Sequence, residues 1–171
     1  MSDAVTTTVR PADRRGILFL ISLLVLILDR ITKIAVSHAL PLGGAHTVIP
    51  RVFRITHVLN TGAAFSLFGD TASPERVRWL LVGFSLVAAV VIIVVLLRIG
   101  RRITGTTLGL ALILGGAIGN AWDRIRTGSV IDFLEVHIVH YHWPDFNVAD
   151  SCIVIGGILL VLHSLVAARE E

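Results

Sequence analysis

Cysteine is nearly absent from this sequence of 171 residues, which contains one, at position 152. A single thiol excludes an intramolecular disulfide, so cysteine usage gives no information on the redox compartment. Charge is scarce as well, because Asp, Glu, Lys and Arg account for 16% of the residues while 54% are hydrophobic. A soluble domain of this length is far more polar. The composition therefore predicts a small integral membrane protein.

The sequence also lacks internal repeats, linkers and low-complexity segments, so we expect one domain over residues 1–171. Its formal net charge is only +3, and the basic residues cluster beside apolar runs. Lipid head groups account for such clusters better than nucleic acid does. We therefore expect membrane lipid as a partner and no nucleic acid. We also expect a monomer, although the sequence itself does not determine the oligomeric state.

Three long stretches contain no charged residue, and each is close to the ~20 residues that a helix needs to cross the hydrocarbon layer. They are residues 79–97, 103–122 and 151–168. A fourth run starts at Gly16 and offers 13 residues before Asp29, or 21 if the helix continues to Val36. Its start is also similar to a secretory signal, but no clear small-residue cleavage site follows, which favours an uncleaved helix. We predict an all-α membrane bundle with four transmembrane helices, at about 16–36, 77–99, 103–123 and 150–168.

Four spans place both ends of the chain on one side of the membrane. The total number of basic residues does not distinguish the two sides. Arginines are dense, however, before the first span and in the short connection at 98–102, and such clusters favour the cytoplasm. Residues 1–15 are therefore predicted to form a cytoplasmic tail. Strand-like composition at 51–60 and 129–139 predicts a small extracytoplasmic sheet, a β-cradle resting on the bundle.

Polar residues that are unusual in apolar surroundings gather at the outer end of this predicted bundle. They are Asp29, Lys33, Asn60, Asn120, Asp123, Arg124, Asp132, Asn147 and Asp150. Ionisable groups near a membrane are costly and are candidates for function. A transporter more often places them near the midplane. Their position at one face favours an enzyme over a transporter or a structural scaffold.

Several of these residues also have a purely structural interpretation. Asp29 and Lys33 are four apart, so they share a helix face as an ion pair or as the edge of a site. Gly116 lies on one stripe with Asn120 and Arg124, where a small residue permits close helix packing. Arg124 could also extend to the head groups. Asn60 opens a turn signal, Asn-Thr-Gly, or faces a substrate.

Three histidines, at positions 137, 140 and 142, raise the question of a metal site. On one continuous strand, residues 140 and 142 face one way and residue 137 faces the other. A catalytic zinc site needs three well-placed ligands and a water, so we expect no metal and place the histidines on an interfacial surface. Glu135 is predicted on the strand face opposite Asp132. Asp145 follows a proline and is predicted in a solvated loop.

Asp132 and Asp150 remain, two acids in apolar settings at the membrane boundary. Asp150 could be the N-cap of the last helix, but that interpretation does not explain Asp132. Each of them lies in one of five segments that resemble the signal peptidase II family. Members of this family, the lipoprotein signal peptidases, are bacterial membrane aspartyl endopeptidases. These segments are "LDRITK" (28–33), "NTGAAFS" (60–66), "GGAIGNAWDR" (115–124), "GSVIDF" (128–133) and "FNVADS" (146–151). They occur in the family's order, while residues 1–15 and 134–145 lie outside the resemblance.

The resemblance implies a four-helix bundle with a periplasmic β-cradle in the bacterial cytoplasmic membrane, and a catalytic pair formed by Asp132 and Asp150. Around the pair it implies substrate-binding residues at Asp29, Lys33, Asn60, Gly116, Asn120, Arg124 and Asn147. It implies no metal and no cofactor. The implied substrate is a prolipoprotein already carrying diacylglycerol on a cysteine, cleaved just before that cysteine.

Carboxylate chemistry agrees with this expectation. Peptide hydrolysis by two carboxyl groups needs one ionised, to take a proton from water, and one protonated, to polarise the scissile carbonyl. Two like charges a few ångströms apart resist ionising together, so the pair shares a proton. The sequence leaves open which acid is the base, although a helix N-terminus favours the charged form of Asp150. Ser66 and Ser151 lack a suitably placed lysine, which disfavours a serine peptidase.

Overall fold

The computed structural model describes residues 12–62, 73–139 and 141–168, so most of the predicted tail, the segment after Gly62, and His140 lie outside the described residues. Within these ranges the chain forms four helices and four strands. The helices are α1 (Arg15–Ala39), α2 (Pro74–Ile99), α3 (Gly105–Thr127) and α4 (Val148–Ala167). The strands are β1 (Ala45–Ile49), β2 (Phe53–Asn60), β3 (Val130–Ile138) and β4 (Tyr141–Phe146).

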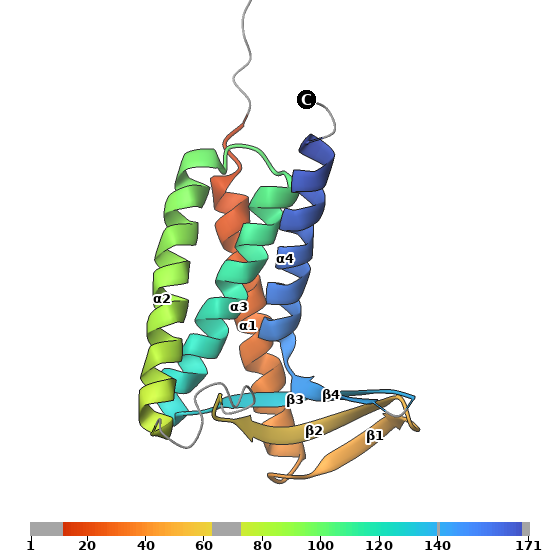
Figure 1. The fold of residues 1–171 in the computed structure, drawn as a ribbon. Coiled ribbons are helices and arrows are strands. Elements are labelled where there is room, and N and C mark those ends of the chain that lie inside the picture. Colours follow the sequence, from red (N-terminus) through yellow and green to blue (C-terminus); the bar gives the residue numbers. More distant parts are fainter. Residues whose placement is uncertain (1–11, 63–72, 140, 169–171) are drawn as a thin grey trace, which may run out of the picture.

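The four helices run alongside one another, and the sheet lies across one end of them (Figure 1). The start of α1 and the end of α4 lie together at the opposite end (Figure 1). The predicted helical bundle with a small sheet is therefore confirmed. β1 and β4 were not predicted, because β1 has only five residues and β4 contains His, Pro and Asp without a clean alternation.

Three helices, α2, α3 and α4, are long and apolar enough to cross a membrane. Local capping explains where α2 begins and where α3 ends. Ser73 accepts a hydrogen bond from the Arg76 backbone N–H, and Pro74 follows it in the first turn of α2, where a missing N–H costs nothing. α3 ends at Gly128, whose φ of 84° is left-handed and suits glycine.

The buried core lies where α1, α2 and α3 meet. Leu18, Leu96 and Leu114 are almost fully buried there. The outward faces of the helices are apolar instead of polar, as shown by Leu24 and Val87, which are 55% and 65% exposed. An exposed apolar belt of this extent is typical of a surface that contacts lipid or another protein.

Glycines allow α3 and α4 to approach unusually closely. A Cβ atom built on Gly109 would lie 2.6 Å from the Gly156 carbonyl oxygen, and one on Gly156 would lie 2.5 Å from the Gly109 oxygen. A Cβ on Gly116 would collide with the backbone oxygen of Ala149. The packing interpretation of Gly116 is therefore confirmed, whereas the contact of Gly109 with Gly156 was not predicted. Gly116 fixes the distance between α3 and the first turn of α4, where Asp150 lies.

The sheet is an antiparallel meander in the order β1-β2-β3-β4. Ile55 pairs with Leu134, and Leu134 pairs with Phe146, so these apolar side chains share the face that meets α1. Arg54 pairs with Glu135 on the other face. Because residues alternate along a strand, Asp132 lies on the face of Leu134, opposite Glu135, as the sequence predicts.

Candidate active site

Asp132 lies near the start of β3, where the sheet meets the helices, and is only 2% exposed. Two amides hold its carboxylate. The Asn60 side chain donates to Oδ2 at 2.9 Å, and the Asn147 side chain donates to Oδ1 at 2.7 Å. Asn60 is the last residue of β2, so the sheet itself brings it to Asp132. Among the described residues this buried carboxylate has two neutral donors and no direct cation, which is chemically unusual.

Asp150 lies in the first turn of α4, and Asn147 is the N-cap of that helix. The Asn147 side chain accepts from the Asp150 backbone N–H at 2.9 Å, while the Asn147 backbone N–H donates to Asp150 Oδ2 at 3.2 Å. This reciprocal pattern is a capping box. The alternative that Asp150 is the N-cap is therefore wrong, because Asn147, three residues earlier, occupies that position.

Asn147 and Asn120 join the two acids. Besides its bond to Asp132, the Asn147 amide donates to Asn120 Oδ1 at 3.3 Å. Asn120 in turn donates to Asp150 Oδ1 at 2.7 Å. Each carboxylate is thus oriented by asparagines from two different elements, and a single residue, Asn147, contacts both acids.

A buried ion-pair cluster lies directly behind these asparagines. Lys33 is fully buried, and its Nζ lies 2.8 Å from Asp29 Oδ2, 2.8 Å from Asp123 Oδ2 and 3.1 Å from Asn120 Oδ1. Asp29 Oδ1 accepts from the Ala149 backbone N–H at 3.1 Å. The cluster therefore fastens α1 to α3 and to the first turn of α4, next to Asp150.

Asp123 was noticed in the sequence but not assigned to the site, and Arg30 was not considered for it. Asp123 is 2% exposed and pairs with both Lys33 and Arg30. Its position three residues after Asn120, on the same side of a helix, is the signal that could have identified it. Arg124 is partly buried in the same region and interacts electrostatically with Asp150, Asp132 and Asp123.

The pKa of Asp132 is raised to about 6. Burial is the main cause, because it penalises the charged carboxylate, and the negative charge of Asp150 adds to it. The amides of Asn60 and Asn147 oppose the shift by stabilising the anion. A cavity of about 300 Å³, lined in part by Asn60, Thr61 and Asp132, opens beside this carboxyl group. Asp132 is therefore poised to exchange a proton near neutral pH next to an accessible space.

Two expectations about the following segment are wrong. Asp145 is not in a solvated loop but in β4, where burial and the charge of Glu135 raise its pKa. His137 and His142 do not face opposite ways, because β3 ends at Ile138 and β4 begins at Tyr141, so the two histidines are cross-strand partners. A pair directly opposite across two strands shares a face.

The Ser151 hydroxyl donates a hydrogen bond to the Asn147 backbone oxygen at 2.9 Å, so it is bound within the first turn of α4. Ser66 lies outside the described residues. The structure brings together seven side chains through hydrogen bonds of 3.3 Å or less: Asp29, Lys33, Asn60, Asn120, Asp132, Asn147 and Asp150. Gly116 supports them through backbone packing. The arrangement suits acid–base chemistry on a substrate at the end of the bundle.

Comparison with known proteins agrees with this geometry. Residues 21–166 match the family described as Signal peptidase (SPase) II. A lipoprotein signal peptidase of Pseudomonas putida is 44% identical over 152 residues, covering 88% of each chain. One from Paraburkholderia phytofirmans is 44% identical over 149 residues, covering 87% of this chain and 84% of the relative.

Solved structures of bacterial membrane enzymes share the fold. One superposes with a TM-score of 0.82 at 26% identity, covering 95% of this chain and 96% of that one. A second gives 0.77 at 28% identity, covering 90% and 96%. Because the sequence match spans most of its length, the chain belongs to the signal peptidase II family of aspartic-type membrane peptidases.

Proposed function

We propose that this chain removes the signal peptide from prolipoproteins by cutting just before a cysteine that carries diacylglycerol. The name of its relatives, lipoprotein signal peptidase, supports this substrate class. One observation carries the chemistry: Asp132 and Asp150 are both held by Asn147 at the junction of sheet and bundle. Two carboxyl groups that share a proton are sufficient to hydrolyse a peptide bond with water.

In the proposed reaction, ionised Asp150 takes a proton from water while protonated Asp132 hydrogen-bonds the scissile carbonyl. The water oxygen bonds to the carbonyl carbon, and the carbonyl oxygen takes the Asp132 proton, giving a tetrahedral diol. Asp150 then protonates the amide nitrogen, the C–N bond breaks, and Asp132 regains its proton from the diol. The raised pKa of Asp132 and the position of Asp150 at the positive end of a helix dipole support this division of roles.

The same proposal assigns the surrounding residues. Asn60, Asn120 and Asn147 orient the carboxylates, and Arg124 is available to bind the substrate backbone. Asp29 and Lys33 are 0% exposed, so we propose that they act by holding Asn120 and α4 in place. Gly116 acts in the same way, by setting the separation of α3 and α4.

We further propose that α1 crosses the membrane together with α2, α3 and α4. Its charged residues Asp29 and Lys33 point into the bundle, whereas Leu20, Leu24 and Ile31 on its outer side are 52%, 55% and 59% exposed. The lipid-facing surface of α1 is then apolar. The active site would lie at the periplasmic face of the bacterial cytoplasmic membrane, with both chain ends, including a tail at 1–15, in the cytoplasm.

The substrate proposal is tested with purified protein and two synthetic peptides of one sequence, one carrying diacylglycerol on the cysteine and one without it. We expect the lipidated peptide to be cut immediately before the cysteine and the unmodified peptide to remain intact. Mass spectrometry of both products identifies the bond. Equal cleavage of the two peptides would contradict the proposed dependence on the lipid.

The topology proposal is tested by single cysteines introduced into a Cys152→Ser background. Thr47→Cys places a thiol on the exposed strand β1, and Arg101→Cys places one in the exposed connection between α2 and α3. A membrane-impermeant maleimide added outside the cytoplasmic membrane of intact cells should label Thr47→Cys alone. Labelling of Arg101→Cys without permeabilisation would contradict the orientation.

A further inference from the structure

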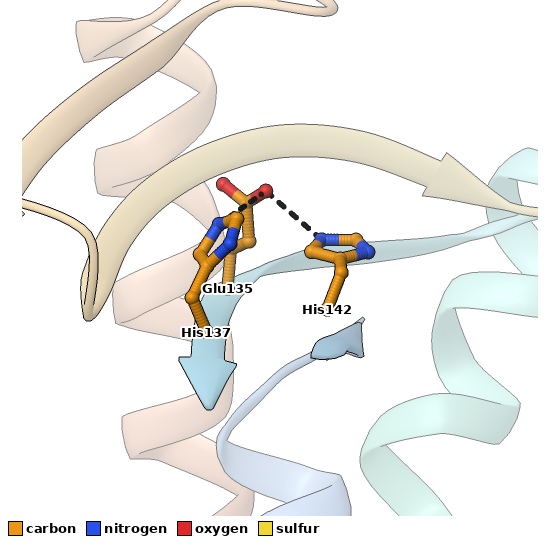
Figure 2. Close-up of side chains that lie close together, drawn as sticks. All are labelled: Glu135, His137 and His142. Carbon is orange, nitrogen blue, oxygen red and sulfur yellow. Dashed lines mark ion pairs between the residues drawn. The ribbon is translucent and has the colours of Figure 1, made fainter. Parts of the chain in front are cut away.

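A second group of ionisable side chains gathers around Glu135, which lies on the strand face opposite Asp132; two residues near it, His142 and Asp145, also line the cavity beside Asp132. Glu135 and His137 are two residues apart on β3, and His142 faces His137 from β4. Figure 2 shows the three side chains converging on the same side of the strands. One ligand atom from each lies within 4.8 Å of the others. The proposed peptide hydrolysis uses none of them.

The distances between the ligand atoms of this group are close to those found around a single metal ion. Glu135 Oε1 lies 2.9 Å from His142 Nε2 and 3.1 Å from His137 Nε2 (Figure 2). Ligand atoms about 2.0–2.1 Å from a tetrahedral zinc ion are separated from one another by roughly 3.3 Å. The group therefore needs only small side-chain adjustments to surround an ion of that size.

A fourth oxygen is available at the edge of the group. Asp145 Oδ1 lies 3.6 Å from His142 Nε2 and makes no hydrogen bond within the described chain. Its other oxygen accepts from the Thr56 hydroxyl at 3.3 Å. The Asp145 carboxylate is therefore held by the sheet through one oxygen, with the other near His142.

Glu135 also directs one oxygen away from the histidines, but this Oε2 makes an ion pair with Arg54 and no hydrogen bond within the described chain. Arg54 Nε lies 2.9 Å from Glu135 Oε2, while Oε1 faces the two histidines. His137 Nε2 is buried and, despite its 3.1 Å approach to Oε1, makes no hydrogen bond within the described chain. Ligating carboxylates typically have their second oxygen held by an outer partner, which is the role open to Arg54 and Thr56.

We propose that Glu135, His137 and His142, with Asp145 as the fourth ligand, bind one zinc ion on the outer face of the sheet. Two imidazoles favour a transition metal over Mg²⁺ or Ca²⁺, which prefer all-oxygen sites. The two carboxylates neutralise the ion, and Zn²⁺ accepts a tetrahedral set of nitrogen and oxygen ligands. The ion links β3 to β4 and has access from solvent, because the His142 side chain is 52% exposed.

The test is calorimetric titration of the untagged full chain in detergent with ZnCl₂. We expect one ion per chain. His137→Gln and His142→Gln should each weaken binding at least about 100-fold, the upper end of what loss of an outer partner costs. The matched control, His46→Gln, changes an exposed histidine on β1 and should leave the affinity unchanged.

Two results would overturn the proposal: absence of stoichiometric zinc binding, or equal affinity in the His137→Gln/His142→Gln double variant. Unchanged thermal unfolding of that variant in EDTA, compared with wild type in EDTA, shows that it is folded. Zinc X-ray absorption gives an independent result. We expect two imidazoles and two oxygen ligands at about 2.0–2.1 Å, and a spectrum with no imidazole would contradict the site.

Discussion

Asn147 donates a 2.7 Å hydrogen bond from its side chain to Asp132, across the boundary between α4 and the sheet. The same residue caps α4 and binds Asp150 through its backbone N–H. One asparagine thus couples the start of a helix to the position of both acids. Because Asn147 is fully buried, water does not readily replace it.

Substituting Asn147→Ser separates its two roles. Both Asn147→Ser and Asn147→Ala remove the buried amide, which should cost about 1–3 kcal/mol of stability, but serine remains a good N-cap, so Asn147→Ala should lose about 1 kcal/mol more than Asn147→Ser. Serine has no amide to reach Asp132 or Asn120, and misplacing a catalytic group costs on the order of 100-fold in rate. We expect kcat to fall by about that factor in both variants. Full activity of Asn147→Ser would show that the bond to Asp132 is dispensable.

The protonation of Asp132 should be visible directly. With a pKa of about 6, its carboxyl group is protonated below that pH and ionised above it. The infrared band of a buried protonated carboxyl should therefore disappear as pH rises through about 6. Since the negative charge of Asp150 helps to raise this pKa, Asp150→Asn should move the transition to lower pH.

Cleavage should follow the same titration, because the proposed reaction needs one proton on the pair. We expect kcat/KM to decrease as pH rises through about 6, where the pair loses its last proton. A rate that keeps increasing well above this pH, with the infrared band already lost, would contradict Asp132 as the initial acid.

Removing the buried cation should destabilise the fold. Lys33→Met leaves Asp29 and Asp123 as buried acids with one partner fewer, and breaking a buried pair from one side costs about 3–5 kcal/mol. Thermal unfolding in detergent measures the loss. The control is Arg98→Met, which changes an exposed charge near the end of α2 and should leave the unfolding midpoint nearly unchanged. Equal midpoints for Lys33→Met and wild type would argue against the buried cluster.

Helix separation is tested with two glycines. Gly116→Ala introduces a methyl group against the Ala149 backbone and should cost about 1–3 kcal/mol through overpacking, with loss of activity as α4 and Asp150 shift. Gly157→Ala adds the same methyl where nothing lies within 4 Å. It should be neutral or slightly stabilising, since alanine favours helix over glycine. Equal behaviour of the two variants would show that Gly116 does not set the spacing.

The helices and the polar centre could be predicted from the sequence because their signals are local. An uncharged run of helix length is evident from residues 79–97 alone. The pairing of Asp29 with Lys33 follows from a spacing of four. Even the opposite faces of Asp132 and Glu135 follow from the alternation of a single strand.

Relationships between strands could not be predicted in this way. The partnership of His137 with His142 depends on where β3 ends and on a register shift between Leu134 and Val136. A one-residue error in the position of that turn moves every side chain of β4 to the other face of the sheet. Asp145 was predicted in a solvated loop because it follows a proline, whereas the pairing of β4 with β3 partly buries it beside Glu135. Asp123 required knowledge of which helices pack together.

The central claim is that Asp132 and Asp150 act as one catalytic unit, and a double-mutant comparison tests it most directly. Cleavage of the diacylglyceryl peptide is measured for Asp132→Asn, Asp150→Asn and the double variant. Residues acting as a unit are strongly non-additive. We therefore expect each single variant to lose at least about 1,000-fold in kcat, with no further loss in the double variant. Near-normal cleavage by either single variant, or losses that multiply in the double variant, would contradict the account.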